Sequence, residues 1–291
     1  MASEAKNTFD IADGITREQA IAGTDYTTNS FTINVERVAA KVTMTCENPV
    51  LADKNGGEAG GTISGMAFNL HGGATKAYRM RQNPFEEIAD NAWDYSVNSK
   101  TVATSLDNIT LSDNVAYCLE NIHDARTEYM TGNTTYLTLY TKFQPTNVVD
   151  CADEIKALKP NTQPTGSSFY VVKEGEFAGN YIMKTDLEAY QAFEGNTGKL
   201  PAGVNVLSKE YVGGVCWFGP IYIGQTATDL DNAPVVRNTW YNLKIAGITL
   251  PGDPKEPTIT DPEQPLVPGT NVAISLNVMP WNFIGRDIEL Q

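Results

Sequence analysis

The residues able to carry acid–base, nucleophilic or metal chemistry are few in this sequence and lie far apart. The chain has four cysteines and two histidines: Cys46, Cys118, Cys151, Cys216, His71 and His123. Because no CxxC pair occurs, a zinc site would need distant residues to converge, and buried free thiols are the simpler interpretation. Each histidine is more typical of a surface or hydrogen-bonded residue than of a catalytic base.

Motifs for catalysis or cofactor binding are absent from the sequence. It holds no GxSxG, no HExxH, no phosphate-binding loop and no GxGxxG between a strand and a helix. Asp229–Asn232 lacks the glycine and final glutamate of an EF-hand and is interpreted as a turn. The four tryptophans could offer platforms for sugars, although sandwich cores bury tryptophan routinely: Trp93, Trp217, Trp240 and Trp281. We predict no catalytic residue, no metal site, no cofactor and no enzymatic activity.

The composition indicates a folded, acidic, strand-rich protein. Its 291 residues carry 21 Lys and Arg against 35 Asp and Glu, for a net charge of −14, and 41% are hydrophobic. The hydrophobic fraction is sufficient for a core, whereas the negative charge excludes nucleic acid and anionic membrane surfaces as electrostatic partners. No run of about 18 apolar residues occurs, so no membrane-spanning helix is predicted.

Alternating apolar and polar residues predict short strands along most of the chain. The predicted strands occupy 31–46, 65–70, 134–143, 168–172, 179–183, 214–224 and 239–250. The first strand contains a phase slip near Arg37, which predicts a bulge or a change of sheet. A capping box at Thr185–Glu188 predicts a helix that Gly195 would end.

These elements predict a mainly β protein with two tandem β-sandwich domains. The boundary is placed in the polar, proline-containing segment near 145–165, where the strand pattern is interrupted. The predicted organisation is therefore an N-terminal β-sandwich over 1–150, a C-terminal β-sandwich over 151–250, a Pro-rich linker over 251–269 and a C-terminal strand segment over 270–291.

The C-terminal segment is unusual because a strand follows a stiff linker. Six of the 15 prolines of the chain fall within residues 251–269. Such a segment runs extended and could span on the order of 60 Å. The following residues alternate as a strand and keep apolar content to the C-terminus: Val272, Ile274, Leu276, Val278, Trp281, Phe283, Ile288 and Leu290.

A strand on a tether is not stable alone and must dock on a sheet. The simpler interpretation is that it packs back as the last strand of its own domain. The alternative is donor-strand addition, in which it enters a groove of a neighbouring subunit. That contact joins a tail to a groove, so its repetition would give an open filament.

The order of motifs resembles that of Bacteroidia fimbrillins. The stretches Val35–Val42, Tyr117–Asn121 and Asn133–Tyr136 resemble their first domain, and Val236–Tyr241 resembles their RN-x-x-Y strand. The ending, from Val272 to Leu290 with Met279-Pro280-Trp281, is similar to their C-terminal signature. The chain is most similar to the major-subunit branch related to the minor (short) fimbria.

This resemblance implies a structural subunit of a type V pilus, built from transthyretin-like β-sandwiches. It implies export as a lipoprotein attached to the outer membrane, and cutting by a surface Arg-specific protease that opens a groove for the C-terminal strand of another copy. The chain is expected to begin near the mature end, with Arg17 as the alternative cleavage site. Candidate groove residues come from the first strand: Phe31, Ile33, Val35, Val38, Val42 and Met44.

The implied partners are copies of the same chain, anchor and tip subunits of the pilus, and adhesion targets on host or bacterial surfaces. The repeated negative charge would keep filaments apart in solution. The alternative function is a tip or anchor adhesin, or a glycan-binding surface lipoprotein of the same fold, with Trp93 or Trp217 at the glycan site.

Overall fold

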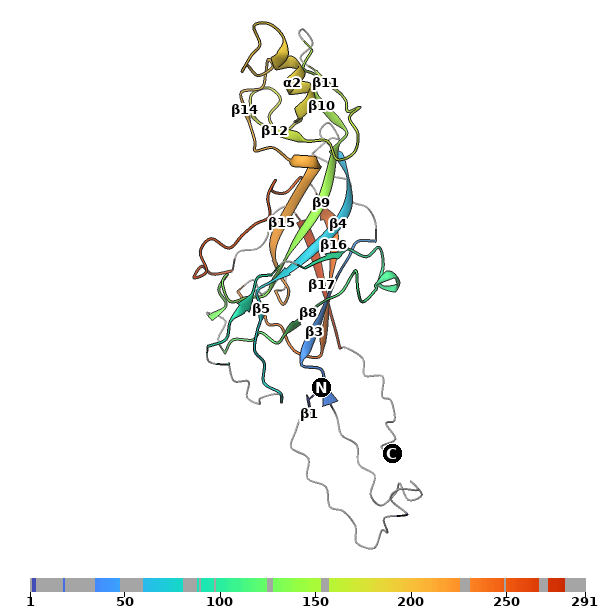
Figure 1. The fold of residues 1–291 in the computed structure, drawn as a ribbon, viewed down its shortest axis with the longest axis vertical. Helices are drawn as coiled ribbons and strands as arrows, with labels where there is room; N and C mark the ends of the chain where they lie inside the picture. Colours follow the sequence, from blue (N-terminus) through green and yellow to red (C-terminus); the bar gives the residue numbers. More distant parts are fainter. Residues whose placement is uncertain are drawn as a thin grey trace.

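The computed structural model shows a mainly β protein, elongated along one axis (Figure 1). The structure describes residues 2–3, 18, 35–47, 60–80, 88, 90–96, 98–124, 128–152, 157–225, 231–248, 250–266 and 272–280. The predicted mainly β class is confirmed. No helix in these ranges is both long and apolar enough to cross a bilayer.

Two four-stranded sheets form the main body, with strand orders β15-β9-β4-β7 and β17-β16-β3-β8. Their strands are β3 (Ala39–Thr45), β4 (Gly61–His71), β7 (Ser99–Thr101), β8 (Ala116–Leu119), β9 (Tyr136–Pro145), β15 (Val215–Tyr222), β16 (Thr239–Ile248) and β17 (Val272–Pro280). Neighbouring strands are antiparallel except β3 and β16, which run parallel. A parallel pair needs a long connection, and the chain between these two strands supplies most of the remaining fold.

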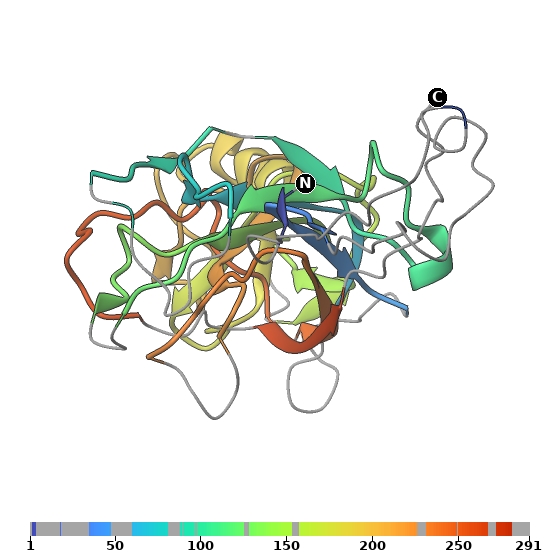
Figure 2. The same ribbon diagram turned by 90° about the horizontal axis from the view of Figure 1, so that it is seen from below.

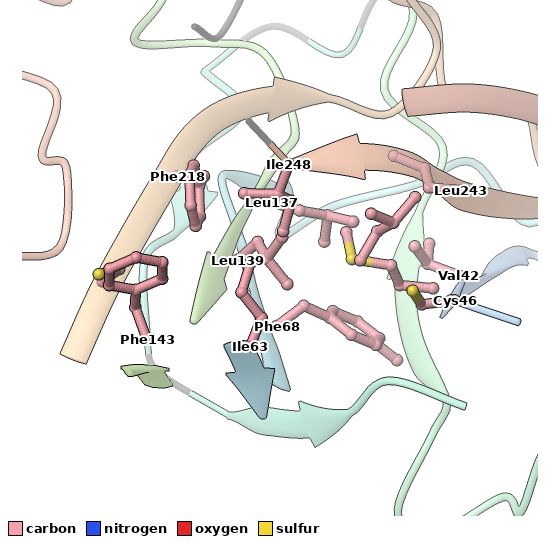
Figure 3. Close-up of a cluster of buried hydrophobic side chains, with 14 of the residues drawn as sticks. Val42, Cys46, Ile63, Phe68, Leu137, Leu139, Phe143, Phe218, Leu243 and Ile248 are labelled. Atoms are coloured by element: carbon pink, nitrogen blue, oxygen red, sulfur yellow. The ribbon is translucent and has the colours of Figure 1, made fainter. Parts of the chain in front are cut away.

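The inward-facing side chains of both sheets form one hydrophobic core (Figure 3). Val42 of β3 and Leu243 of β16 meet Phe68 of β4 and Leu139 of β9, and all four are at most 2% exposed. The alternation along each strand places these residues on one face, and burying that face against the other sheet provides the main stabilisation.

A smaller unit is inserted between β9 and β15 and lies at one end of the sandwich (Figure 1). It contains β10 (Asn147–Val149), β11 (Leu158–Pro160), β12 (Phe169–Glu174), β13 (Tyr181–Met183), α2 (Lys184–Ala192) and β14 (Val206–Leu207). It has its own buried cluster, which includes Val172, Ile182 and Leu187. Phe169 also packs against Phe143 of β9, with ring centroids 5.6 Å apart, so the insert is joined to the main core.

The predicted domains 1–150 and 151–250 do not match the arrangement of the sheets. β15 and β16, from the second predicted domain, pair with β9 and β3 from the first. The strands of the insert, residues 147–208, pair only with one another among the described strands. The error has a physical cause: strand periodicity shows which residues share a face, but not which distant strand supplies the hydrogen-bonding partner.

The predicted phase slip near Arg37 is confirmed. β2 (Val35–Glu36) pairs with β1 (Ala2–Ser3). β3 begins at Ala39 and belongs instead to the four-stranded sheet β17-β16-β3-β8. The predicted helix is also confirmed as α2, but its capping box is not. The residue at the N-cap is Met183, which makes no side-chain cap, and Thr185 lies inside the helix.

The remaining described elements are short. They are β5 (Gly73–Ala74), β6 (Trp93–Asp94), η1 (Leu106–Asn108) and η3 (Val212–Gly214). β5 and β6 pair with each other, and the residues after β7 cross from one sheet to the other. In this crossing Val102 donates its N–H to Met66 of β4, and Ala103 donates to Met44 of β3, so one side of the sandwich is partly closed.

Candidate assembly site

The C-terminal strand docks on its own chain as an edge strand. β17 pairs antiparallel with β16 through nine register positions, from Val272 opposite Ile248 to Pro280 opposite Thr239. The predicted strand is confirmed, and its docking corresponds to the simpler of the two interpretations. On its other side β17 pairs with no strand among the described residues.

The register matches the apolar alternation of β17 to the buried face of β16. The four predicted donor-strand residues of β17 lie opposite four residues of β16 that are at most 3% exposed: Val272 opposite Ile248, Ile274 opposite Ile245, Leu276 opposite Leu243 and Val278 opposite Tyr241. A bulge between Ile245 and Gly247 keeps the two sets in phase. The other predicted donor residues, Trp281, Phe283, Ile288 and Leu290, lie outside the described residues.

The predicted linker is a docked segment rather than a free tether. Residues 251–266, here called the strap, run along the outside of the sandwich, coloured orange to red in Figures 1 and 2. Asp253 and Trp217 of β15 exchange two backbone hydrogen bonds of 2.7 and 2.8 Å. Further along, Gly132 and Thr131 donate their N–H groups to Pro262 and Gln264, each at 2.9 Å.

Glu256 attaches the middle of the strap to the outer face of the β4–β9 sheet. Its Oε1 accepts hydrogen bonds from the Thr138 hydroxyl at 2.6 Å and the Asn69 amide at 2.8 Å, and lies 2.9 Å from His71 Nε2. The three partners alternate with core residues, so they point away from the core. They are nevertheless at most 6% exposed, because the strap covers them.

The far end of the strap is buried in an apolar cluster. Leu266 is 6% exposed and packs with Tyr129, Tyr136 and Tyr222. Only residues 267–271 separate it from β17, and such a connection can span about 20 Å at most. The predicted reach on the order of 60 Å is therefore wrong while the strap stays docked.

Replacing Glu256 with alanine is expected to lower the free energy of unfolding by about 1–3 kcal/mol, because buried donors on Asn69 and Thr138 lose their acceptor. Chemical denaturation measures this change. The exposed strap residue Glu263 is the matched control, and its alanine variant should change stability by less than about 0.5 kcal/mol. Equal effects of the two variants would show that Glu256 does not fasten the strap.

The Glu256 contribution is also expected to depend on pH. Burial raises the pKa of this carboxyl, but hydrogen bonds from Thr138, Asn69 and His71 lower it by more, so the net pKa lies below its ordinary value of 4.5. A lowered folded-state pKa gives stability that is fully present above pH 4.5 and is lost as the pH falls through the lowered value. The stability difference between wild type and Glu256→Ala should therefore shrink on acidification below pH 4.5, as urea titrations can measure.

The predicted groove residues that the structure describes lie in β2, in β3 or between these two strands. Val42 and Met44 are completely buried in β3, which has β16 on one side and β8 on the other, so β3 offers no free edge along these neighbours. Val38 is half-buried between β2 and β3, and Val35 lies in β2 opposite Ser3. Phe31, Ile33 and the alternative cleavage site Arg17 lie outside the described residues.

At the opposite end of the sheet from β17, β8 pairs with β3 alone among the described strands. Beside it is a groove of about 480 Å³ whose apolar wall includes Leu70, Ala74, Leu111, Val115 and Ala116. Leu111 is 70% exposed there. No strand is predicted over 116–119, and the residue pattern there does not show which strand pairs with it.

The cysteines and histidines considered for catalysis or metal binding are buried within the fold. All four cysteines are buried and outside any disulfide, as predicted, and burial raises the pKa of Cys118, Cys151 and Cys216 to about 12. Thiols with such pKa values are poor nucleophiles. His123 is 6% exposed and packs edge-on against Tyr129, with centroids 4.7 Å apart. The described residues hold no group of three or more metal-ligand side chains.

The two tryptophans of the alternative glycan site are packed against protein. Trp217 is half-buried, makes a T-shaped contact with Tyr140 at 5.2 Å and is bonded to the strap through its backbone. Trp93 is half-buried in β6 and lies 6.4 Å from the His123 ring. Neither ring forms a freely exposed platform, which disfavours the predicted roles in sugar stacking.

Comparison with known structures gives distant similarity to proteins from Porphyromonas, Bacteroides and Parabacteroides. A fimbrilin, FimA, from Porphyromonas gingivalis W83 is 16% identical, with 87% of this chain and 61% of that chain covered and a TM-score of 0.36. A candidate cell adhesion protein from Bacteroides eggerthii is 11% identical, with 86% and 58% covered and a TM-score of 0.37. One from Parabacteroides distasonis is 14% identical, with 89% and 56% covered and a TM-score of 0.36.

The chain thus spans less than two thirds of the length of these solved proteins. Among curated protein sequences, none matches it. One family model does match, over residues 209–287: major fimbrial subunit protein type IV, fimbrillin, C-terminal. The matched range contains β15, β16, the strap and β17. The resemblance to fimbrillins is therefore confirmed, and residues 209–287 of this chain match the fimbrillin C-terminal family model.

Proposed function

We propose that this chain is a structural subunit of a bacterial surface fimbria and that it polymerises head to tail by exchanging β17. The observation that carries the proposal is β17 itself, an edge strand held by one neighbour and joined to the strap by residues 267–271. Release of β17 breaks the β16–β17 ladder and leaves the pairing of β16 with β3 in place.

The β16 edge of the next subunit is the proposed acceptor. It is the edge whose complementarity to β17 can be seen directly, including the bulge between Ile245 and Gly247. The exchange replaces the β16–β17 pair within one chain by the same pair between two chains. The free energy gained in the new pair therefore offsets the free energy lost in the old one. When each subunit receives its strand from one neighbour and donates its own to another, the result is an open chain, whereas reciprocal exchange between two copies would close a dimer.

The short connection to the strap sets the geometry of the proposed filament. Because residues 267–271 allow only about 20 Å between Leu266 and Val272, the β16 edge of the next subunit must lie close to the docked end of the strap. The strap then transmits any pull on β17 to the sandwich through Leu266, the Pro262 and Gln264 hydrogen bonds and Glu256.

Maturation and placement on the cell form a further part of the proposal. The fimbrillin family match supports surface display, self-assembly and joining to anchor and tip subunits. Export as an outer-membrane lipoprotein and cutting by an Arg-specific protease follow from the resemblance. Adhesion to host or bacterial surfaces would then be a property of the assembled fimbria.

Deleting residues 270–291 is expected to give a chain that can receive a strand but cannot donate one. The truncated protein alone should form no filaments, and a small fraction mixed with full-length protein should shorten them, because each incorporated copy ends growth. Electron microscopy of filament lengths measures both effects. Filaments formed by the truncated protein alone would overturn the proposal.

A variant that keeps the full chain tests whether the apolar side chains of β17 are needed for polymerisation. Replacing Ile274 and Leu276 with aspartate places two charges opposite buried residues of β16 and should also abolish filaments. The matched control changes two exposed valines, Val206 of β14 and Val212 of η3, to aspartate and should polymerise normally.

A further inference from the structure

A basic pocket lies where the insert meets the strap. It has a volume of about 360 Å³ and is lined by Lys173, Ser208, Lys209, Tyr211, Asp253, Pro254 and Lys255. Small-molecule sites in proteins start at about 300 Å³ and occur preferentially at junctions between structural units. The pocket is separate from the β16–β17 pair, so its role does not depend on the proposed polymerisation.

The insert wall of the pocket is shaped by an irregularity in β12. The register against β14 shifts between Val172 and Glu174, which leaves Lys173 as the extra residue of a bulge. The Ser208 hydroxyl accepts the Val171 N–H at 2.9 Å and so replaces a strand partner at this point. Bulges re-aim side chains, and here the re-aimed side chain is a lysine that lines the pocket.

The strap wall and the floor are held by hydrogen bonds. Asp253 exchanges two backbone bonds with Trp217, and the Tyr211 hydroxyl donates to the Gly252 carbonyl at 2.8 Å. A side chain at Gly252 would overlap the Trp217 carbonyl, so only glycine allows this close approach. The Tyr211 ring stacks on Phe169, with centroids 4.6 Å apart. The residues between these contacts therefore have a defined position.

The charge of the pocket is opposite to that of the chain. Three lysines face one carboxylate here, whereas the whole chain has a net charge of −14. Elsewhere Lys159, Lys184 and Lys244 each lie within 3.4 Å of a carboxylate oxygen. Within the described part of the chain, none of the three pocket lysines forms an ion pair.

We propose that this pocket binds an acidic sugar, a monosaccharide unit carrying a carboxylate or sulfate group. The three ammonium groups supply the attraction for the anion. The Asp253 carboxylate would repel a simple anion, but it can accept hydrogen bonds from the hydroxyl groups of a sugar. A ligand with an acidic group at one end and hydroxyl donors at the other matches both parts of the lining.

Binding of the full-length monomer to sialyllactose, sulfated lactose and neutral lactose tests this proposal, for example by saturation-transfer NMR and biolayer interferometry. At least one acidic sugar should bind at least tenfold more tightly than lactose, and its affinity should fall as salt is raised. The triple variant Lys173→Gln/Lys209→Gln/Lys255→Gln should weaken that binding by more than tenfold, at roughly threefold for each exposed charge pair lost.

The control is a second triple variant with the same change in net charge, Lys142→Gln/Lys199→Gln/Lys244→Gln. Its affinity for the acidic sugar should stay within about twofold of wild type. The proposal is overturned if acidic sugars bind no better than lactose, or if both triple variants lose binding equally. It is also overturned if inorganic sulfate or an acidic peptide binds as tightly as the acidic sugars.

Discussion

A disulfide between positions 244 and 275 is expected to stop polymerisation completely and reversibly. In the double variant Lys244→Cys/Ser275→Cys, oxidation of the monomer will join β17 to β16 of its own chain. Electron micrographs should then show no filaments. After a reductant is added, filaments should form as they do from wild-type protein.

The geometry of the β16–β17 pair supports this variant. Lys244 and Ser275 are directly opposite each other. Opposed residues in antiparallel strands have Cα atoms about 4.5–5.5 Å apart, within the about 4.4–6.8 Å that disulfides span. Lys244 is half-exposed and its ion pair with Glu47 is a surface contact, so its loss should cost little.

The native cysteines should not interfere with this experiment. All four are buried, and burial raises the pKa of three of them, Cys118, Cys151 and Cys216, to about 12. The single variants Lys244→Cys and Ser275→Cys are the controls, and each should polymerise under oxidising conditions. Filaments formed by the oxidised double variant would show that β17 need not leave β16.

The largest loss of stability is expected from breaking the Arg237–Glu120 pair. Arg237 has a fully buried side chain, and its Nε and Nη2 donate to the two oxygens of Glu120 at 3.1 and 2.9 Å. Arg237→Met leaves the Glu120 carboxylate buried without its cation, which typically costs about 3–5 kcal/mol. The melting temperature should fall by on the order of 10 °C.

This pair connects two segments that are distant in sequence and lie at the same end of one sheet. Arg237 precedes β16, Glu120 follows β8, and Nη2 also donates to the Tyr78 carbonyl at 2.9 Å. The neighbouring Asn238 has a positive φ of 56°, which asparagine tolerates better than most residues. The Tyr241 hydroxyl accepts the Val236 N–H at 2.8 Å and closes the corner. The RN-x-x-Y motif is thus explained as a structural corner.

A double variant distinguishes an unpaired charge from a general packing defect. Replacing Glu120 with glutamine in the Arg237→Met background removes the buried charge, so part of the lost stability should return. The partly exposed pair Lys184–Glu210 is the control, and Glu210→Gln should cost less than about 1 kcal/mol. Identical destabilisation of the single and double variants would contradict a role for the uncompensated carboxylate.

Local elements of this fold could be predicted from the sequence, whereas their partners could not. The phase slip near Arg37 was readable because a change from odd to even apolar positions moves side chains to the other face. The alternation from Val272 to Val278 likewise predicted β17. Nothing in either pattern shows that β3 lies between β16 and β8, because that choice depends on contacts about 200 residues apart.

The strap is a second element whose local conformation could be predicted from the sequence but whose partners could not. Its prolines predicted an extended segment, and the structure confirms that it forms no long strand. Its docking depends on Glu256 meeting Asn69 and Thr138, three residues that are distant in sequence. The available signal was the placement of the small polar residues Asn69 and Thr138 between apolar neighbours in β4 and β9, which suits a covered face as well as an exposed one.

The most direct test of strand exchange uses the Lys244→Cys/Ser275→Cys variant in the opposite order. Filaments are first assembled with reductant and then oxidised, and the product is boiled in SDS and run on a non-reducing gel. If β17 of each subunit occupies the β16 edge of the next, oxidation will link neighbours and produce a ladder that reduction returns to monomer. If β17 stays on its own chain in the filament, the gel will show only monomer, and the proposed exchange is wrong.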